Sequence, residues 1–115
     1  HTTYQMTDKL LLQLKSYKIV DLLQVIHMRS DGHYIEIHTT EQKSTLIERD
    51  TLTQMIDRLP NDLFIRVHRS HIINLYHVQE FNSQKAIMTN GDVIPLSRSI
   101  KLSDYIPKDR SDNPN

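Results

Sequence analysis

The chain has 115 residues, which suits one domain with a single hydrophobic core and is too short for two ordinary domains. Its 14 Lys and Arg residues balance its 14 Asp and Glu residues, so nucleic acid cannot be held by bulk attraction and would need locally placed charge. The lack of cysteine excludes disulfide scaffolds, thiolate zinc sites and cysteine nucleophiles.

Targeting signals are also missing from the sequence. No apolar run approaches the roughly 20 residues that span a bilayer, and no secretory leader is visible. We therefore expect a cytoplasmic protein. The chain begins at His1 without a methionine, which suggests a piece of something longer.

The first third of the chain predicts short strands. Alternating leucines make Asp8 to Lys15 a strand. The following stretch fits both helix and strand patterns, and we expect one helical turn near Asp21 to Leu23 and then a strand from Gln24 to Arg29. The turn signal Ser30-Asp31-Gly32 joins that strand to a second one, His33 to Thr39, in a hairpin with Ile35 and Ile37 facing inward.

One amphipathic helix is expected near the middle of the chain. A polar turn from Thr40 to Lys43 and a short strand from Ser44 to Glu48 come before it. Asp50 or Thr51 can cap the helix, with Gln54 completing a capping box after Thr51. Its apolar stripe consists of Leu52, Met55, Ile56 and Leu59, and Pro60 ends it.

The segment Phe64 to Asn74 places hydrogen-bonding side chains on an apolar frame. Ile65 and Val67 alternate as the inward side of a strand, which turns Arg66 and His68 outward. After Arg69 and Ser70 the apolar spacing becomes closer to a helical turn, at Ile72, Ile73 and Tyr76. The polar cluster should therefore lie at the end of a strand, on a rigid base.

A second hairpin follows, from Lys85 to Met88 and from Val93 to Leu96. The Asn90-Gly91 pair between them suits a type I′ turn, and Pro95 indicates an edge strand. Residues 107–115 lack apolar side chains and should be disordered, and residues 1–8 should be flexible. The expected fold is a mostly β, antiparallel domain over residues 9–106.

Catalysis finds little support. His68 and His71 lie three residues apart, but no ligand set completed by a carboxylate accompanies them, and Ser70 lacks the surroundings of a nucleophile. The two glycines are both explained by turns. We expect no enzyme, no catalytic residue, no metal site, no cofactor and no small-molecule substrate.

The residues alone leave the role of the polar cluster open. His68, Arg69 and Ser70 suit contacts to phosphates and base edges, and equally suit a turn at a strand end. Arg66 reads more simply as a surface arginine, His33 as the start of a strand, and Lys101 as solvated. Arg98, between two serines, reads equally well as a surface strand end.

Two motifs together give a family resemblance. The run F-I-R-V-H-R-S-H-I-I-N-L, followed by the Asn90-Gly91 hairpin and by I-P-L-S-R-S from Ile94 to Ser99, resembles the LytTR family of bacterial DNA-binding domains over Lys9 to Leu102. The resemblance implies an elongated stack of small antiparallel sheets with one short amphipathic helix. It also implies the output domain of a bacterial transcriptional regulator, such as the response regulator of a two-component system, with loops inserted into successive major grooves.

The resemblance assigns DNA contacts to three loops. His33, Arg69 and Arg98 would contact bases, since a guanidinium can bridge guanine O6 and N7 and an imidazole can donate or accept. The phosphate contacts would be His68, Ser70, Ser97, Ser99 and Lys101. Asp31, beside the first loop, could cap the turn or exclude a base.

The expected partner is double-stranded DNA with paired or repeated half-sites. Two copies would read it, as a dimer formed on DNA or through a missing upstream domain. The main alternative is a small β-rich protein-interaction module without nucleic-acid binding, which would use edges near Pro95 and the face of Tyr34, Glu36 and His38. A metal-dependent enzyme that uses His68, His71 and His77 is a distant third.

Overall fold

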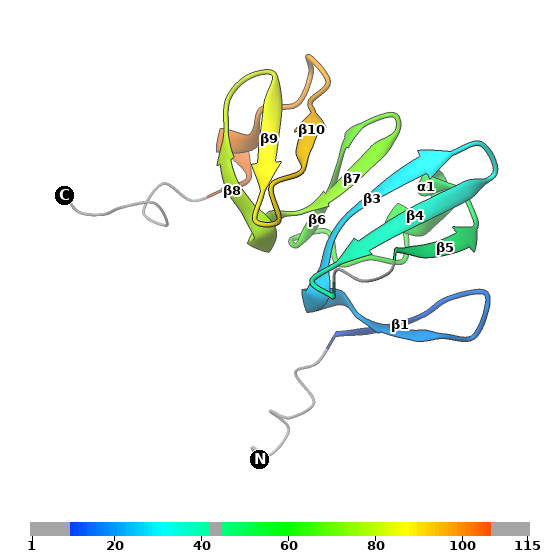
Figure 1. Ribbon diagram of the computed structural model, residues 1–115. Helices are drawn as coiled ribbons and strands as arrows, with labels where there is room; N and C mark the ends of the chain where they lie inside the picture. The colour runs from blue at the N-terminus through cyan, green and yellow to red at the C-terminus, as the bar shows by residue number, and fades with distance from the viewer. Residues whose placement is uncertain (1–9, 42–44, 107–115) are drawn as a thin grey trace.

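The computed structural model describes residues 10–41 and 45–106. Within them the chain forms three small antiparallel sheets and one short α-helix (Figure 1). The prediction of a mostly β fold built from small antiparallel sheets is therefore confirmed. The predicted flexible segments, 1–8 and 107–115, lie outside the described residues.

The ten strands pair only with antiparallel neighbours in the described part of the chain. Strands β1 and β2 form a hairpin, the central sheet has the order β5-β4-β3-β7-β6, and the third sheet has the order β10-β9-β8. Their bounds are β1 Leu11–Gln13, β2 Ile19–Asp21, β3 Val25–Asp31, β4 Tyr34–Thr39, β5 Leu46–Arg49, β6 Phe64–His68, β7 His71–Asn74, β8 Val78–Phe81, β9 Lys85–Met88 and β10 Val93–Pro95.

The α-helix α1, Leu52–Ile56, begins as the sequence predicts. Thr51 is its N-cap, with the hydroxyl accepting from the backbone N–H of Gln54 at 3.2 Å. The helix ends before Pro60, with Asp57 as its C-cap, and a turn carries Leu59 into the core. None of the helices among the described residues is long and apolar enough to cross a membrane.

Three single turns of 3₁₀-helix complete the described elements: η2 Leu22–Gln24, η3 Leu75–His77 and η4 Leu102–Asp104. The predicted helical turn near Asp21 to Leu23 corresponds to η2. The Asp21 carboxylate caps it by accepting from the backbone N–H of Leu23 at 3.0 Å.

Both faces of the central sheet are covered at β3, β6 and β7, by different layers. The first core fills the space between the sheet, α1 and the β1–β2 hairpin, with Phe64, Met28 and Ile72 fully or almost fully buried. The second core lies between the sheet and the β8–β9–β10 sheet, and includes Val67 and Ile73. Figure 1 shows this stack, with the three-stranded sheet on one side of the central sheet and the β1–β2 hairpin on the other.

The two covered faces explain one wrong prediction. Ile72 and Ile73 lie side by side in strand β7 and belong to the two different cores, so the spacing that suggested a helical turn is a strand buried on both sides. Only Tyr76, in η3, is helical. Strands β2 and β8 were not predicted.

The last hairpin has the predicted strands and a different turn. β10 is an edge strand, as Pro95 indicated. In the turn only Gly91 has a positive φ, +93°, whereas a type I′ turn would require Asn90 to have one as well. The N–H of Gly91 donates to Met88 O at 2.8 Å, which closes a tight turn before the glycine. The type I′ prediction is therefore wrong.

Candidate nucleic-acid interface

Two of the predicted DNA-facing turns lie at the same end of the central sheet. β3 pairs antiparallel with both β4 and β7, so the β3–β4 turn with His33 is next to the β6–β7 turn with Arg69. The N–H of Ser30 donates to the carbonyl of Ser70 at 3.0 Å and ties these two turns together.

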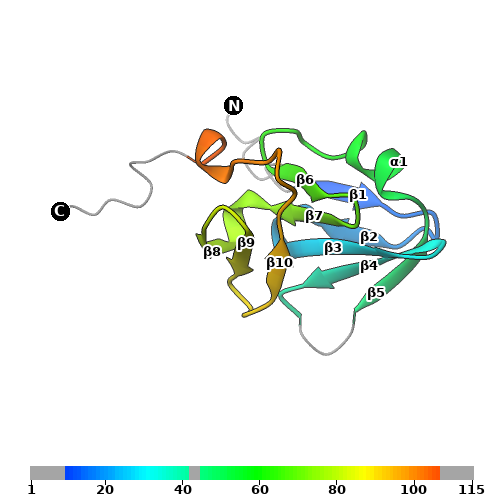
Figure 2. The same ribbon diagram turned by 90° about the horizontal axis from the view of Figure 1, so that it is seen from above.

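The third predicted loop follows β10 and reaches the same region. Figure 2 shows this orange segment running back across β6 and β7. The N–H of Ser97 donates to Val67 O at 2.7 Å, which fixes the segment against β6. Together the two motifs line a depression of about 220 Å³, formed by Arg66, Val67, His68, Arg69, Ser97, Ser99 and Ile100.

The predicted base-contacting side chains are accessible. His33, Arg69 and Arg98 are all exposed. Among the predicted phosphate contacts Ser99 and Lys101 are exposed as well, whereas His68, Ser70 and Ser97 are half-buried. Long cationic side chains thus extend from loops whose backbones are held by the sheet.

His68 is oriented by the turn itself. Its Nδ1 accepts the backbone N–H of Ser70 at 3.1 Å. In the neutral ring the proton must then lie on Nε2, so this nitrogen is the one that can donate to an external acceptor such as a phosphate oxygen. Ser97 and Ser99, across the depression, place their hydroxyl oxygens 3.2 Å apart.

Arg66 supports the turn that carries Arg69, a role that the sequence did not reveal. Its Nη2 donates to the carbonyl of Arg69 at 2.7 Å, and its Nη1 donates to Thr53 Oγ1, in the first turn of α1, at 2.9 Å. One guanidinium therefore connects the turn to the helix. The contact between Arg66 and Thr53 joins residues 13 apart in the sequence, and no motif spacing predicts it.

The β3–β4 hairpin has its own support. Arg29 makes two hydrogen bonds to Glu36 across the strand pair, Nε to Oε1 at 3.3 Å and Nη2 to Oε2 at 3.0 Å. The hydrogen bond from Arg29 lowers the pKa of Glu36. Asp31 lies 3.9 Å from the same guanidinium, so the acid beside the proposed groove-entering loop has a cationic neighbour.

His71, beside His68 in the same turn region, has a strongly shifted pKa. Burial, together with the nearby His68, lowers its pKa to about 4. Its ring meets that of His68 edge-on, with centroids 5.4 Å apart. His71 is therefore uncharged near neutral pH and adds no positive charge to the interface.

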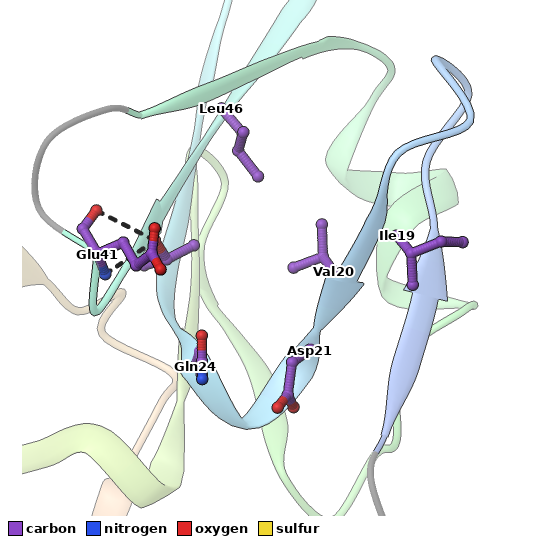
Figure 3. Close-up of a pocket in the computed structure, with 7 residues that line it drawn as sticks. Ile19, Val20, Asp21, Gln24, Glu41 and Leu46 are labelled. Carbon is purple, nitrogen blue, oxygen red and sulfur yellow. Dashed lines mark hydrogen bonds between the residues drawn. The ribbon is translucent and has the colours of Figure 1, made fainter.

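A second depression of about 220 Å³ lies at the opposite end of the central sheet and has a different character. Figure 3 shows it between the β1–β2 hairpin and the β4–β5 edge, with Asp21 and Glu41 on its rim and apolar side chains, Ile19, Val20 and Leu46, around them. Carboxylates repel phosphate. The depression between the H-R-S and S-R-S motifs is thus the better nucleic-acid surface.

Comparisons with known proteins identify the family of this chain. The LytTr DNA-binding domain family matches residues 15–102. A CO-responsive transcriptional regulator, RcoM of Rhodospirillum rubrum, is 35% identical over 88 residues, which cover 71% of this chain and 36% of that protein. The sensory transduction protein LytT of Bacillus subtilis is 35% identical over 90 residues, covering 74% of this chain and 36% of that protein.

A solved structure has the same fold. The LytTr DNA-binding domain of a putative methyl-accepting/DNA response regulator from Bacillus cereus superimposes with a TM-score of 0.64 and 26% identity, over 79% of this chain and 87% of that one. The chain spans about a third of the length of the curated relatives named above. Because the family matches most of the chain, from the turn after β1 to η4, this protein belongs to the LytTr DNA-binding domain family.

Proposed function

We propose that this domain binds double-stranded DNA in a sequence-specific way, through three loops that enter successive major grooves. The observation that carries the proposal is the convergence of the H-R-S turn and the S-R-S segment on one depression, with Arg69 and Arg98 exposed beside it. The β3–β4 turn with His33 lies at the same end of the sheet.

Each proposed contact has a chemical rationale. Arg69 and Arg98 would each read a guanine through its O6 and N7, and His33 would contact a base from the neighbouring turn. The phosphate contacts would come from His68, Ser70, Ser97, Ser99 and Lys101, which fix the register of the domain on the duplex. The side-chain tautomer of His68 favours this role, since its Nε2–H is free of the Ser70 contact.

In its cellular setting the domain would be the cytoplasmic output module of a bacterial transcriptional regulator. The relatives include sensory transduction proteins named LytT and a transcriptional regulatory protein LytR from Staphylococcus aureus. Two copies would bind paired half-sites, because a domain of this size covers little DNA. The upstream part of such a regulator would supply the signal.

The proposal is tested by selecting bound fragments from random duplex DNA and then measuring the affinity of variants for the selected site. We expect Arg69→Ala and Arg98→Ala each to lose about 1–3 kcal/mol of specific binding and to relax discrimination at one base position. The spacing of the selected half-sites reports the number of bound copies.

The matched control is Arg49→Ala, which removes an exposed arginine from β5. Arg49 lies 5.8 Å from the ring centre of Tyr34, outside the depression. It should leave base discrimination unchanged. If folded Arg69 and Arg98 variants kept full discrimination, the site assignment would be wrong, and capture of a protein partner without any selected DNA would favour the interaction-module alternative.

A further inference from the structure

A second cluster of polar side chains lies where the central sheet meets the three-stranded sheet. His27 in β3 and His38 in β4 stack their rings, with centroids 4.3 Å apart and planes 14° from parallel. Asp92, from the loop between β9 and β10, reaches across and accepts a hydrogen bond from His27 Nε2 at 2.8 Å. None of these residues belongs to the depression between the H-R-S and S-R-S motifs.

We propose that His27, His38 and Asp92 form a binding site for a divalent metal ion, with Zn²⁺ as the best match to two imidazoles and a carboxylate. One ligand atom from each residue lies within 4.8 Å of the other two. Tetrahedral zinc holds its N and O ligands about 3.3 Å apart, so closure of the site requires the ligand atoms to approach by up to about 1.5 Å. The His38 ring would also have to rotate out of the stack, because a metal lies in the plane of each imidazole that binds it.

The residues differ in how far they can move. The side chain of His27 is only 4% exposed, whereas those of His38 and Asp92 are 26% and 44% exposed. The buried imidazole would serve as the fixed ligand, and the two partly exposed ligands would adjust around it. A fourth position would remain open to water on the exposed side.

Two of the proposed ligands have pKa shifts in the direction that metal binding requires. Burial lowers the pKa of His27, which keeps this imidazole neutral near neutral pH. The hydrogen bond from His27 lowers the pKa of Asp92, which keeps this carboxyl ionised. The metal would take the place of the proton on His27 Nε2, and that proton would move to Nδ1.

This change of tautomer would break no other hydrogen bond of the ring. His27 Nδ1 has no hydrogen-bond partner among the described residues. The imidazole is therefore held in the described part of the chain by the stack with His38 and by its contact with Asp92, which requires the proton on Nε2 and would be replaced by the shared metal.

The surrounding groups resemble the outer shell of a metal site. Glu36 Oε1 lies 3.2 Å from His38 Nε2, so a carboxylate positions this ring, and with Nε2 donating to Glu36 the Nδ1 atom would be the nitrogen left to bind a metal. Asn90 Nδ2 donates to Asp92 Oδ2 at 3.0 Å, and Asn90 Oδ1 accepts the N–H of Asp92. Both partly exposed ligands are thus oriented by a neighbour before any metal binds.

A bound metal would join three separate elements. β3 and β4 belong to the central sheet, and the β9–β10 loop belongs to the three-stranded sheet that packs against it. The ion would therefore fix the position of one sheet on the other. Because β10 leads directly into the Ser97 to Ser99 segment, the same link would also restrain that segment.

The test is a calorimetric titration of the untagged, metal-free protein with Zn²⁺. A parallel titration with Co²⁺ reports the coordination geometry through the visible absorption of the bound ion. His38→Gln and Asp92→Asn are the test variants, since both side chains are partly exposed and neither change opens a cavity in the core. Asp62→Asn, which neutralises an exposed carboxylate in the turn before β6, is the matched control.

We expect one Zn²⁺ to bind per chain and to raise the unfolding temperature, because the site exists only in the folded state. Affinity should fall at least tenfold in both test variants and remain unchanged in Asp62→Asn. Absence of stoichiometric binding, or equal binding by folded test variants, would overturn the proposal and leave a hydrogen-bonded link between two sheets.

Discussion

At the scale of single residues, Arg66 positions the backbone that carries Arg69, one of the proposed base contacts. Its guanidinium holds the carbonyl of Arg69 and the hydroxyl of Thr53 at the same time, and this geometry needs two N–H groups on one rigid plane. The backbone of the H-R-S turn is therefore positioned by α1, through a contact that a simple surface arginine would not make.

Arg66→Lys tests this role, since it keeps the positive charge and loses the planar, two-armed donor. We expect the free energy of unfolding to fall by about 1 kcal/mol, the typical net contribution of one or two hydrogen bonds. Discrimination at the base read by Arg69 should fall about threefold to tenfold, less than the loss in Arg69→Ala. Competition gel shifts with single-base variants of the selected site measure it.

The lysine variant also separates positioning from charge. If Arg66 acted only through its charge, Arg66→Lys would behave like the wild type and Arg66→Gln would weaken binding to every sequence alike. If Arg66 positions the turn, both variants should lose discrimination at the same base position, and the lysine variant should retain the salt dependence of the wild type.

The sequence predicted the proposed DNA contacts at strand ends, but could not show how these residues meet. His68, Arg69, Ser97 and Ser99 were predicted from two motifs nearly thirty residues apart, and the structure brings them to one depression. Arg66 and Thr53 were not predicted, because their pairing depends on how α1 packs against β6. Such packing leaves no periodic signal in the chain.

At the scale of elements, predictions succeeded where one face of an element is buried or where a side chain caps it. The Thr51–Gln54 cap and the last hairpin are examples. They failed for β2 and β7. In the turn before β2, Tyr17 has a positive φ of +71°. Sequence signals for such a turn rely on Gly or Asn at that position, so a tyrosine does not predict it. β7 is buried on both faces, so apolar and polar residues do not alternate along it.

Asn74 connects several of these elements at the end of β7. It is fully buried, its Nδ2 donates to Leu22 O at 3.3 Å and to Val25 O at 2.8 Å, and its Oδ1 accepts the N–H of Tyr76 at 2.8 Å. A single amide thus caps η3 and joins it to the start of β3. All its hydrogen-bonding groups have partners within the described residues.

We expect Asn74→Ala to lower the free energy of unfolding by about 2–4 kcal/mol, because it leaves buried backbone groups without partners. Urea denaturation followed by circular dichroism measures the loss. Asn82→Ala is the matched control. Its Oδ1 also accepts two backbone N–H groups, from Gln84 and Lys85, but at an exposed turn where water can replace it. A loss in Asn74→Ala no larger than in the control would contradict this role.

At the scale of the whole molecule, stability should depend on pH through two histidines, His27, which is buried, and His71, which is half-buried. Burial lowers the pKa of His27, and burial lowers that of His71 to about 4. Both groups bind protons more readily in the unfolded chain, where the pKa is near 6.5. The free energy of unfolding should therefore fall as the pH is lowered from about 6.5 towards 4, by less than about 1.4 kcal/mol per unit for each histidine.

Urea denaturation at a series of pH values measures this slope. His71→Gln should make the dependence shallower between pH 6.5 and 4, since it removes one titrating group from the folded and unfolded states alike. Gln79→Ser, which changes an exposed side chain that binds no proton, should leave the slope as it is. Equal slopes in the wild type and in a folded His71→Gln would show that His71 does not resist protonation.

Zero net charge and DNA binding are compatible when a few cations are concentrated at one end of the molecule. Arg69, Arg98 and Lys101 are exposed around the H-R-S and S-R-S motifs, whereas Arg29 is neutralised by Glu36. With about three cations facing phosphates and bases, the logarithm of the binding constant should fall with the logarithm of salt concentration with a slope of roughly −3 per domain.

Lys101→Ala should reduce the magnitude of this slope by about one and weaken binding to all sequences alike, because a lysine on a phosphate carries no sequence information. Lys85→Ala, which removes an exposed cation from β9, is the control and should leave the slope unchanged. Fluorescence anisotropy at several salt concentrations measures both. If the slope is steep and neither Lys101→Ala nor the arginine variants alter it, the phosphate-binding surface lies elsewhere. If Lys101→Ala alone changes the slope by one, a single phosphate is assigned to this residue.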